Sequence, residues 1–171
     1  MIHKAQKCPQ KIVYIEGEEE KIIRAANVVK NEHIGIPILV GNEEVIKKKI
    51  SELEYSESDF EIIDPGKDSH HQEYTEKFYK HRQRKGTTIS RAKNLLRQPR
   101  YFGLMMLKNG DAHALIGGLG HSYPTTIQPA LQTIGVKDGI KVVSGLYIVI
   151  IKRKVFFFAD TTVNVNPNSE Q

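Results

Sequence analysis

Residues 11–40, KIVYIEGEEEKIIRAANVVKNEHIGIPILV, contain the pattern that decides the fold. The run 11–15 is rich in β-branched and aromatic residues and predicts a strand that ends at Gly17. Apolar residues then recur at helical spacing through residues 18–31, and three glutamates complement the dipole in the first turn. Residues 36–40 predict the next strand. This order of strand, helix and strand favours parallel strands joined by a helical crossover.

The alternation of helices and strands continues along the chain. Further helices are expected at residues 43–53, 70–85, 89–96, 99–106 and 124–134. Further strands are expected at residues 60–63 and 112–116, the second of them buried. Thr88 is the expected cap of the third of these helices and Pro99 suits the first turn of the next. Tyr74, Phe78 and His81 are expected on one face of the helix at 70–85. The alternation indicates an α/β fold with a mostly parallel sheet.

Two final β-rich runs, residues 141–151 and 155–159, break this alternation. The basic residues 152–154 between them favour a turn, so we expect an antiparallel hairpin. A hairpin alone is marginally stable. We therefore expect this C-terminal piece to need a partner, or the chain to be incomplete.

The composition is that of a globular, water-soluble chain. Of the 171 residues, 39% are hydrophobic and 26% are charged, which excludes a disordered or fibrous protein. No apolar run approaches the ~20 residues needed to cross a bilayer, and the N-terminus has no signal-peptide core. Cys8 is the only cysteine, which excludes an internal disulfide and a cysteine-built zinc site. These features predict a cytoplasmic protein without membrane contact.

Basic residues are concentrated in the middle of the chain. No acidic residue occurs between Glu76 and Asp111, a stretch that holds ten lysines and arginines. Such a stretch attracts anions. Three interpretations stay open: a solvated helix face, a site for a small phosphorylated ligand and, less favoured, a nucleic-acid surface. The aromatic residues of the stretch are at helical spacing, which is typical of core positions rather than of base stacking.

The glycine cluster at residues 117–120 is the strongest local candidate for a binding site. It follows a predicted strand and precedes a predicted helix, so backbone N–H groups at the helix start suit an anion such as phosphate. His121, Ser122, Thr125 and Thr126 add donors. A positive φ is expected at a position such as Gly120. The alternative is a tight turn followed by a capped helix, since the spacing matches neither of the common glycine-rich nucleotide motifs.

Other chemistry is less favoured by the pattern. Ser122 beside His121 suggests a nucleophile and its base, but adjacent side chains point apart and no nucleophile elbow is present. His70 and His71 suggest metal ligands, yet a surface pair is the favoured interpretation because no carboxylate cluster accompanies them. Asp160 follows an apolar run and either lines a cleft or caps the next loop; the sequence does not separate these two roles.

An ordered set of motifs resembles one enzyme family. The motifs are YIEGEE (14–19), PILVG (37–41), RQRKG (82–86), GDA (110–112), GGLGHS (117–122), PALQ (129–132), AD (159–160) and PNSEQ (167–171). The whole chain resembles about the first half of the phosphate acetyl/butyryl transferase domain. RYFGLMM (100–106) and YPTTIQP (123–129) are most similar to the phosphotransacetylase-like C-terminal domain of bacterial NADP-dependent malic enzymes.

The resemblance implies a fold and a domain organisation. The fold is a three-layer α/β/α domain of the isocitrate and isopropylmalate dehydrogenase type, with a cleft between two α/β domains. The first domain is expected at residues 1–138, and the truncated start of the second at residues 139–171. The resemblance also implies a homo-oligomer, a dimer formed through the second domain. It implies neither a membrane nor a nucleic-acid partner.

Eight residues are candidate ligands of phosphate or acyl-CoA, some from their place in the sequence and some from the resemblance: Arg82, Lys85, Gly120, His121, Ser122, Thr126, Gln128 and Asp160. Arg82 and Ser122 match family residues that hold the phosphoryl group. Gln128 stands where the family has a second arginine, which forms a bidentate clamp that glutamine cannot reproduce. The family's remaining catalytic residues lie in the other half of the domain, so this chain alone is expected to be inactive and metal-free.

Three functions follow as expectations. The first is an acetyl-CoA-sensing regulatory domain of an NADP-dependent malic enzyme, whose NADP, divalent metal and malate decarboxylation belong to the rest of that protein. The alternative is the N-terminal half of a phosphate acetyltransferase, which moves acetyl between coenzyme A and phosphate. The third is a stand-alone interaction module. Acetyl-CoA or acetyl phosphate is the expected ligand of the first two.

Overall fold

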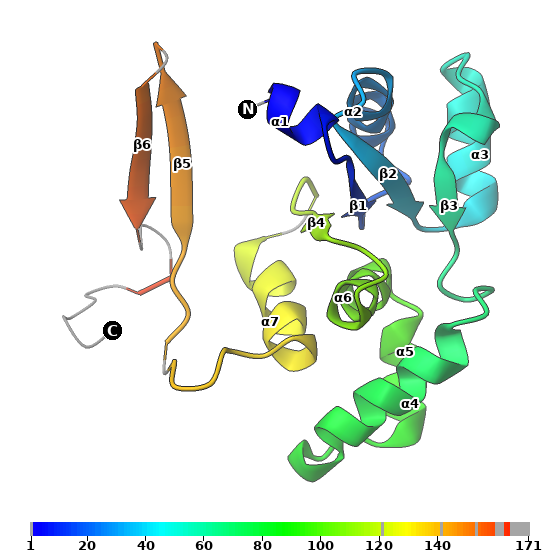
Figure 1. Ribbon diagram of the computed structural model, residues 1–171. Coiled ribbons are helices and arrows are strands. Elements are labelled where there is room, and N and C mark those ends of the chain that lie inside the picture. The colour runs from blue at the N-terminus through cyan, green and yellow to red at the C-terminus, as the bar shows by residue number, and fades with distance from the viewer. Residues whose placement is uncertain (1, 121, 141, 153, 160–162, 165–171) are drawn as a thin grey trace. The chain divides into compact units, whose positions relative to one another are not determined.

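The structure is a computed structural model that describes residues 2–120, 122–140, 142–152, 154–159 and 163–164. The chain divides into two compact units, Met1–Ile134 and Gly135–Gln171. Figure 1 shows the elements of both units along the chain. Among the described helices, none has the length and apolar character needed to span a membrane.

A four-stranded parallel sheet forms the centre of the first unit. Its strands are β1 (Gln10–Tyr14), β2 (Gly35–Val40), β3 (Glu61–Ile63) and β4 (Ala114–Ile116), in the order β3-β2-β1-β4. Val13 of β1 is opposite Ile38 of β2 and Leu115 of β4. The parallel pairing of β1 with β2 confirms the crossover that the sequence predicts.

Helices α2 (Glu20–Asn31) and α3 (Glu43–Glu52) cover one face of the sheet. Tyr14 and Leu39 of the sheet pack there against the buried residues of α2 and α3 in one core cluster. Asn42 caps α3, since its side chain accepts the backbone N–H of Val45 at 3.1 Å. A short helix, α1 (Ile2–Gln6), precedes β1, and a 3₁₀ turn, η1 (Glu57–Asp59), precedes β3.

The opposite face is covered by α4 (His71–Arg82), α5 (Ile89–Leu96) and α6 (Pro99–Asn109), with the 3₁₀ turn η2 (Gln83–Lys85) after α4. The two faces together give three layers, α/β/α, as expected. Gly103 lets α6 approach the sheet closely, because a Cβ there would lie 2.9 Å from Val13 and 3.0 Å from Ile15. Thr88 caps α5 as predicted, by accepting the N–H of Arg91.

The last helix of the first unit is α7 (Tyr123–Thr133), which packs on α6. Gly135, with φ of +84°, follows its end. The second unit contains β5 (Leu146–Ile151) and β6 (Lys154–Ala159), which pair antiparallel and confirm the hairpin. Most of its large apolar side chains are exposed; Phe157 is 66% exposed.

Three local predictions are corrected by the structure. The strand predicted at residues 112–116 begins at Ala114 and lies at the edge of the sheet, so Ala114 and Ile116 are exposed rather than buried. His81 is exposed, because the helix face that buries Tyr74 and Phe78 continues to Arg82, four residues further on. The strand expected from residue 141 begins only at Leu146.

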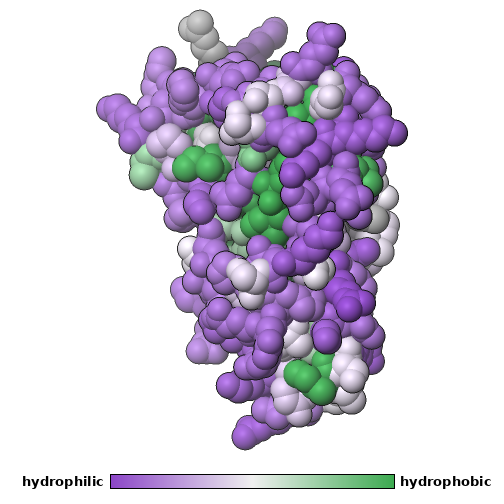
Figure 2. Space-filling model, turned by 90° about the vertical axis from the view of Figure 1, so that its right-hand side faces the viewer, coloured by the Kyte–Doolittle hydropathy of each residue, from purple (hydrophilic) through white to green (hydrophobic). Residues whose placement is uncertain are grey.

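One face of the first unit is largely hydrophilic. Figure 2 shows a mostly hydrophilic face, on which apolar side chains gather mainly in a recess near its middle. This agrees with the burial of the large apolar residues between the sheet and the two helix layers.

Candidate functional site

The carboxyl edge of the sheet brings three loops together. A cavity of about 280 Å³ lies there, lined by residues that follow β1, by Val40 of β2, by Pro99 at the start of α6 and by Gly120 of the glycine cluster. Glu16, Glu18 and Glu19 also line it. This edge is where open parallel sheets bind ligands.

The carboxylate of Glu16 occupies the centre of the glycine cluster. Its Oε2 accepts the N–H groups of Gly118 and Leu119, both at 2.9 Å, and its Oε1 accepts the N–H of Gly120 at 2.7 Å. Gly118 has a φ of +109°, which lets successive N–H groups turn toward one acceptor. The loop is therefore an anion-binding nest that holds a carboxylate of its own chain.

Positive φ is found at Gly118, not at Gly120. The expectation of a positive φ at Gly120 was therefore wrong. Gly117 is constrained by packing instead, because a Cβ there would lie 2.4 Å from Ile15. A side chain at Gly120 would meet only Glu16, at an ordinary 3.5 Å.

Glu18 has a structural contact of a similar kind. Its Oε1 accepts the N–H of Asn42 at 2.8 Å, and its backbone oxygen accepts from the ammonium of Lys49 at 2.5 Å. The acidic residues after β1 thus connect the loops that follow β1, β2 and β4.

The first turn of α7 presents hydroxyl groups beside the glycine cluster. Ser122 is the N-cap residue of α7, but its side chain makes no capping hydrogen bond. Its carbonyl oxygen accepts from the N–H of Thr125 at 3.1 Å and from the Thr125 hydroxyl at 2.6 Å. Thr126 is half-buried and lines a cavity of about 330 Å³ with Gly117 and Gly118. The Ser122 side chain is exposed at this turn.

Tyr101 lies beside α7, and the charges of three arginines act on the pKa of its hydroxyl. The Tyr101 hydroxyl donates to Gln132 of α7 at 2.8 Å. Burial raises the pKa of Tyr101, while the guanidinium groups of Arg100, Arg91 and Arg82 act in the opposite direction. These arginines come from α6, α5 and α4. Three helices therefore contribute positive charge toward Tyr101, whose hydroxyl contacts Gln132 near the end of α7.

Arg100 connects this arginine group to the first turn of α7. Its Nη1 donates to the backbone oxygen of Thr125 at 3.2 Å. A cation that contacts this turn places its charge near the hydroxyls of Ser122 and Thr126. The arrangement suits an anionic ligand at the start of α7.

The end of α4 adds further positive charge. Arg82 is half-buried, and among the described residues its Nε has no hydrogen-bond partner. Although His81 is exposed, its pKa is lowered, first by partial desolvation of the ring and then by the nearby charges of Lys108, Arg82 and Lys85. Lys85 itself is exposed on η2.

The eight candidate ligand residues are distributed as follows. Gly120, Ser122, Thr126 and Gln128 lie in or beside the first turns of α7, with Gln128 exposed. Arg82 and Lys85 lie at the far end of α4 and on η2. His121 and Asp160 lie outside the described residues.

The metal interpretation of His70 and His71 has no support in the described part of the chain. No group of three or more His, Cys, Asp or Glu side chains there could hold a metal ion. The Nδ1 of His70 instead lies 2.9 Å from Oδ1 of Asp68. His71 is half-buried.

Glu16, Arg91 and Arg100 were not identified from the sequence. The sequence could have indicated Glu16 as a site residue, because Glu16 is an acidic residue directly after a predicted strand, as Asp160 is. Arg91 and Arg100 carried none, since each is one of ten basic residues in an acid-free stretch. Their role depends on how α5 and α6 are placed beside α7.

Comparisons with known proteins identify the family. The family model described as Phosphate acetyl/butaryl transferase matches residues 1–171. The phosphate acetyltransferase of Clostridium acetobutylicum is 35% identical over 173 residues, which cover 98% of this chain and 52% of that protein. The phosphate acetyltransferase of Bacillus subtilis is 34% identical over 160 residues, which cover 94% and 49%.

Solved structures agree with these sequences. The EutD phosphotransacetylase from Staphylococcus aureus superposes with a TM-score of 0.88 at 30% identity, covering 99% of this chain and 52% of that one. A phosphotransacetylase from Streptococcus pyogenes gives 0.85 at 33% identity, covering 93% and 49%. The chain thus spans about half the length of these relatives. It belongs to the phosphate acetyl/butyryl transferase family.

Proposed function

We propose that this chain supplies the first α/β domain of a phosphate acetyltransferase and that it binds the phosphoryl group during transfer of acetyl between coenzyme A and phosphate. The family match over residues 1–171 carries this proposal. The relatives compared above are named phosphate acetyltransferases. These names support the acetyltransferase expectation, and nothing in the comparisons points to a malic-enzyme regulatory domain or to its NADP and metal.

The phosphoryl group is placed at the first turn of α7 rather than on the glycine N–H groups. Glu16 already accepts three N–H groups of the glycine cluster, and a phosphate there would meet its negative charge. The hydroxyls of Ser122 and Thr126 remain on the α7 side. Arg100 contacts the same turn through Thr125.

Arg82 and Lys85 are proposed to complete the anion site from α4 and η2. A guanidinium binds a phosphoryl group through two parallel N–H bonds. The buried Nε of Arg82, which has no hydrogen-bond partner among the described residues, is such a donor. Gln128 is proposed to replace a second clamping arginine. The loss of one charged hydrogen bond costs about 2–3 kcal/mol, so this site should bind phosphate more weakly than the sites of family members that have the arginine.

His121 and Asp160 are retained as proposed ligands on their place in the sequence. The two-domain fold of the dehydrogenase type and dimer formation through the second domain are proposed from the resemblance, and a cytoplasmic location is proposed from the composition. The exposed apolar side chains of β5 and β6 are consistent with a partner surface in the second unit.

The experiment is a phosphotransacetylase assay of the complete gene product. Acetyl phosphate and coenzyme A should give acetyl-CoA and phosphate, followed by thioester absorbance. Turnover that falls at least tenfold in Arg82→Ala, but not in the exposed neighbour Arg84→Ala, supports the proposal. Absent turnover together with an acetyl-CoA-dependent change in malate oxidation would instead support the regulatory function.

A further inference from the structure

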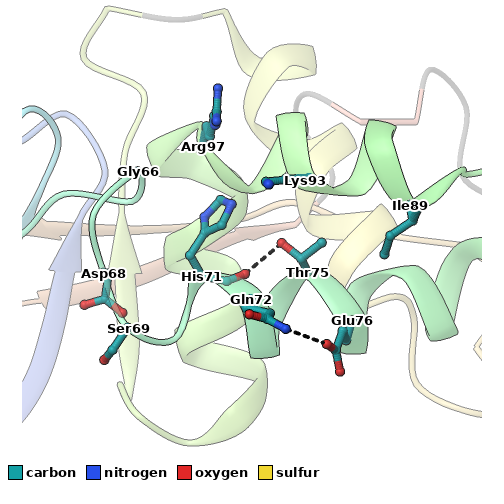
Figure 3. Close-up of a pocket in the computed structure, with 10 residues that line it drawn as sticks. All are labelled: Gly66, Asp68, Ser69, His71, Gln72, Thr75, Glu76, Ile89, Lys93 and Arg97. Carbon is teal, nitrogen blue, oxygen red and sulfur yellow. Dashed lines mark hydrogen bonds between the residues drawn. The ribbon is translucent and has the colours of Figure 1, made fainter.

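A separate cavity of about 670 Å³ lies between α4, α5 and the loop that follows β3. Figure 3 shows Asp68 and Ser69 of the loop, His71 and Glu76 of α4, Lys93 of α5 and Arg97, the C-cap residue of α5, around it. The volume is within the range of small-molecule sites, ~300–1,000 Å³. It lies at the start of α4, whereas Arg82 of the proposed phosphoryl site is at the end of the same helix. His71 and Arg82 are eleven positions apart, which is about 16 Å along the helix.

His71 presents unused hydrogen-bonding groups to this cavity. Both of its ring nitrogens are buried, and neither has a hydrogen-bond partner among the described residues. Figure 3 shows the ring directed into the space between α4 and α5. Its backbone oxygen accepts from Thr75 at 2.7 Å, which fixes the first turn of α4. Because buried polar groups are nearly always paired, these nitrogens favour a polar ligand group at the ring.

Two cations, one on α5 and one at its C-cap, line the same cavity. Lys93 and Arg97 are four residues apart, so they share one helix face, and both are exposed. In the described part of the chain neither forms an ion pair or a side-chain hydrogen bond. Figure 3 shows the Lys93 ammonium directed toward the His71 ring. Like charges at this spacing repel, and a bound anion would remove that cost.

Two acidic residues line the same cavity and indicate which groups the ligand carries beside its anion. Oδ1 of Asp68 accepts from the backbone N–H of His70 at 2.8 Å, and the carboxylate of Glu76 accepts from Gln72 at 3.3 Å. Each carboxylate has further acceptor capacity. A ligand that carries hydroxyl or amino groups beside its anion would satisfy both ends of the cavity, whereas a bare anion would be opposed by the carboxylates.

We propose that this cavity binds a small phosphorylated metabolite of nucleoside monophosphate size. The phosphoryl group contacts His71, Lys93 and Arg97, and the hydroxyl or amino groups contact Asp68 and Glu76. No atom of the proposed phosphoryl site at α7 takes part. The cavity is a second site, independent of acetyl transfer.

The test is a titration of the ¹⁵N-labelled 171-residue chain with adenosine 5′-monophosphate, followed by backbone amide shifts. Adenosine and inorganic phosphate are titrated in parallel as the two halves of the ligand. The test variant is Lys93→Ala/Arg97→Ala. The matched control is Lys21→Ala/Lys48→Ala, which removes the same charge from exposed positions on α2 and α3, on the other face of the sheet.

We expect saturable shifts at Ser69, Gln72 and Lys93 with the nucleotide and at least tenfold weaker binding of adenosine and of phosphate. The test variant should lose about 10- to 100-fold in affinity and the control less than twofold. His71→Ala should also weaken binding, because it removes a ring donor.

Three results would overturn the site: no saturable shift at the cavity, shifts confined to residues 122–126, or equal losses in the test and control variants. The second result would leave the α7 anion site intact. Conversely, an Arg82→Ala variant that loses acetyl transfer should still show the nucleotide-induced shifts at Ser69 and Lys93. The two proposals can therefore be refuted independently of each other.

Discussion

The Oε1 atom of Glu16 accepts the backbone N–H of Gly120 at 2.7 Å, across 104 positions of the sequence. This bond joins the loop after β1 to the loop after β4, at neighbouring strands of the sheet. With the bonds to Gly118 and Leu119, it makes Glu16 the residue that fixes the glycine cluster. The loop conformation thus depends on a carboxylate from elsewhere in the chain, and this leads to the first prediction.

Replacement of Glu16 by alanine should destabilise the chain by about 1–3 kcal/mol, because three N–H groups lose a charged acceptor and gain only water. Urea unfolding followed by circular dichroism measures the change. Glu19→Ala is the matched control, since Glu19 is exposed nearby and its side chain makes no capping bond to α2. Equal stabilities of the two variants would show that the Glu16 contact contributes nothing.

Alanine at Gly118 should be more harmful than alanine at Gly120. Gly118 has a φ of +109°, where a Cβ is strained by about 1–2 kcal/mol whatever the surrounding space. Gly120 has no such φ, and its new Cβ would lie 3.5 Å from Glu16. Thermal unfolding of the two variants gives the comparison. A Gly120→Ala variant that melts lower than Gly118→Ala would contradict the assignment of strain to Gly118.

The sequence predicted the layers of the first unit because local patterns determine them. Apolar periodicity and end signals place α2, β2 and α3 within two residues of their observed bounds. The position of a strand at the edge of a sheet does not follow from a local pattern, because it depends on which strands pair with which. The hydrophobicity of residues 112–116 therefore could not predict that Ala114 and Ile116 are exposed.

The site was less predictable than the fold, for the same reason. The glycine cluster was found, yet its occupation by Glu16 requires contacts across 102 to 104 positions. The bond from Arg100 to Thr125 depends on the packing of α6 against α7, which no motif encodes. Likewise, the sequence favours a surface pair at His70 and His71, whereas in the structure the His71 ring lies in the space between α4 and α5.

Alkaline stability should depend on Tyr74. Burial, and then a hydrogen bond to Asp111, raise the pKa of Tyr74 far above its ordinary value of about 10. Above pH 10 the unfolded chain loses this proton while the folded chain keeps it, so stability is complete below pH 10 and falls as the pH rises.

The Tyr74→Phe variant lacks that contribution. Above pH 10 the free energy of unfolding of the wild type should therefore fall more steeply than that of the variant, and the two slopes should differ by about 1.4 kcal/mol per pH unit. Urea midpoints at pH 8, 10 and 11 measure the slope. Tyr123→Phe, at an exposed position, is the control. Parallel slopes for the wild type and Tyr74→Phe would show that Tyr74 ionises equally in both states.

Restoring an arginine at Gln128 should strengthen phosphate binding at the start of α7. Gln128 is exposed one turn beyond Thr125, so a longer side chain fits without repacking. A guanidinium there adds a charged, bidentate donor beside Arg100, worth about 2–3 kcal/mol or some 30- to 150-fold in affinity. Calorimetry with inorganic phosphate measures the gain.

The controls for this variant separate specific binding from added charge. Leu131→Arg adds the same charge at an exposed position of the same helix, nearly one turn further on, and should raise affinity less than threefold. Ser122→Ala in the Gln128→Arg background should remove part of the gain, because the hydroxyl at the N-cap is a proposed ligand. An equal gain from Leu131→Arg, or a gain that Ser122→Ala leaves untouched, would place the phosphoryl group away from the first turn of α7.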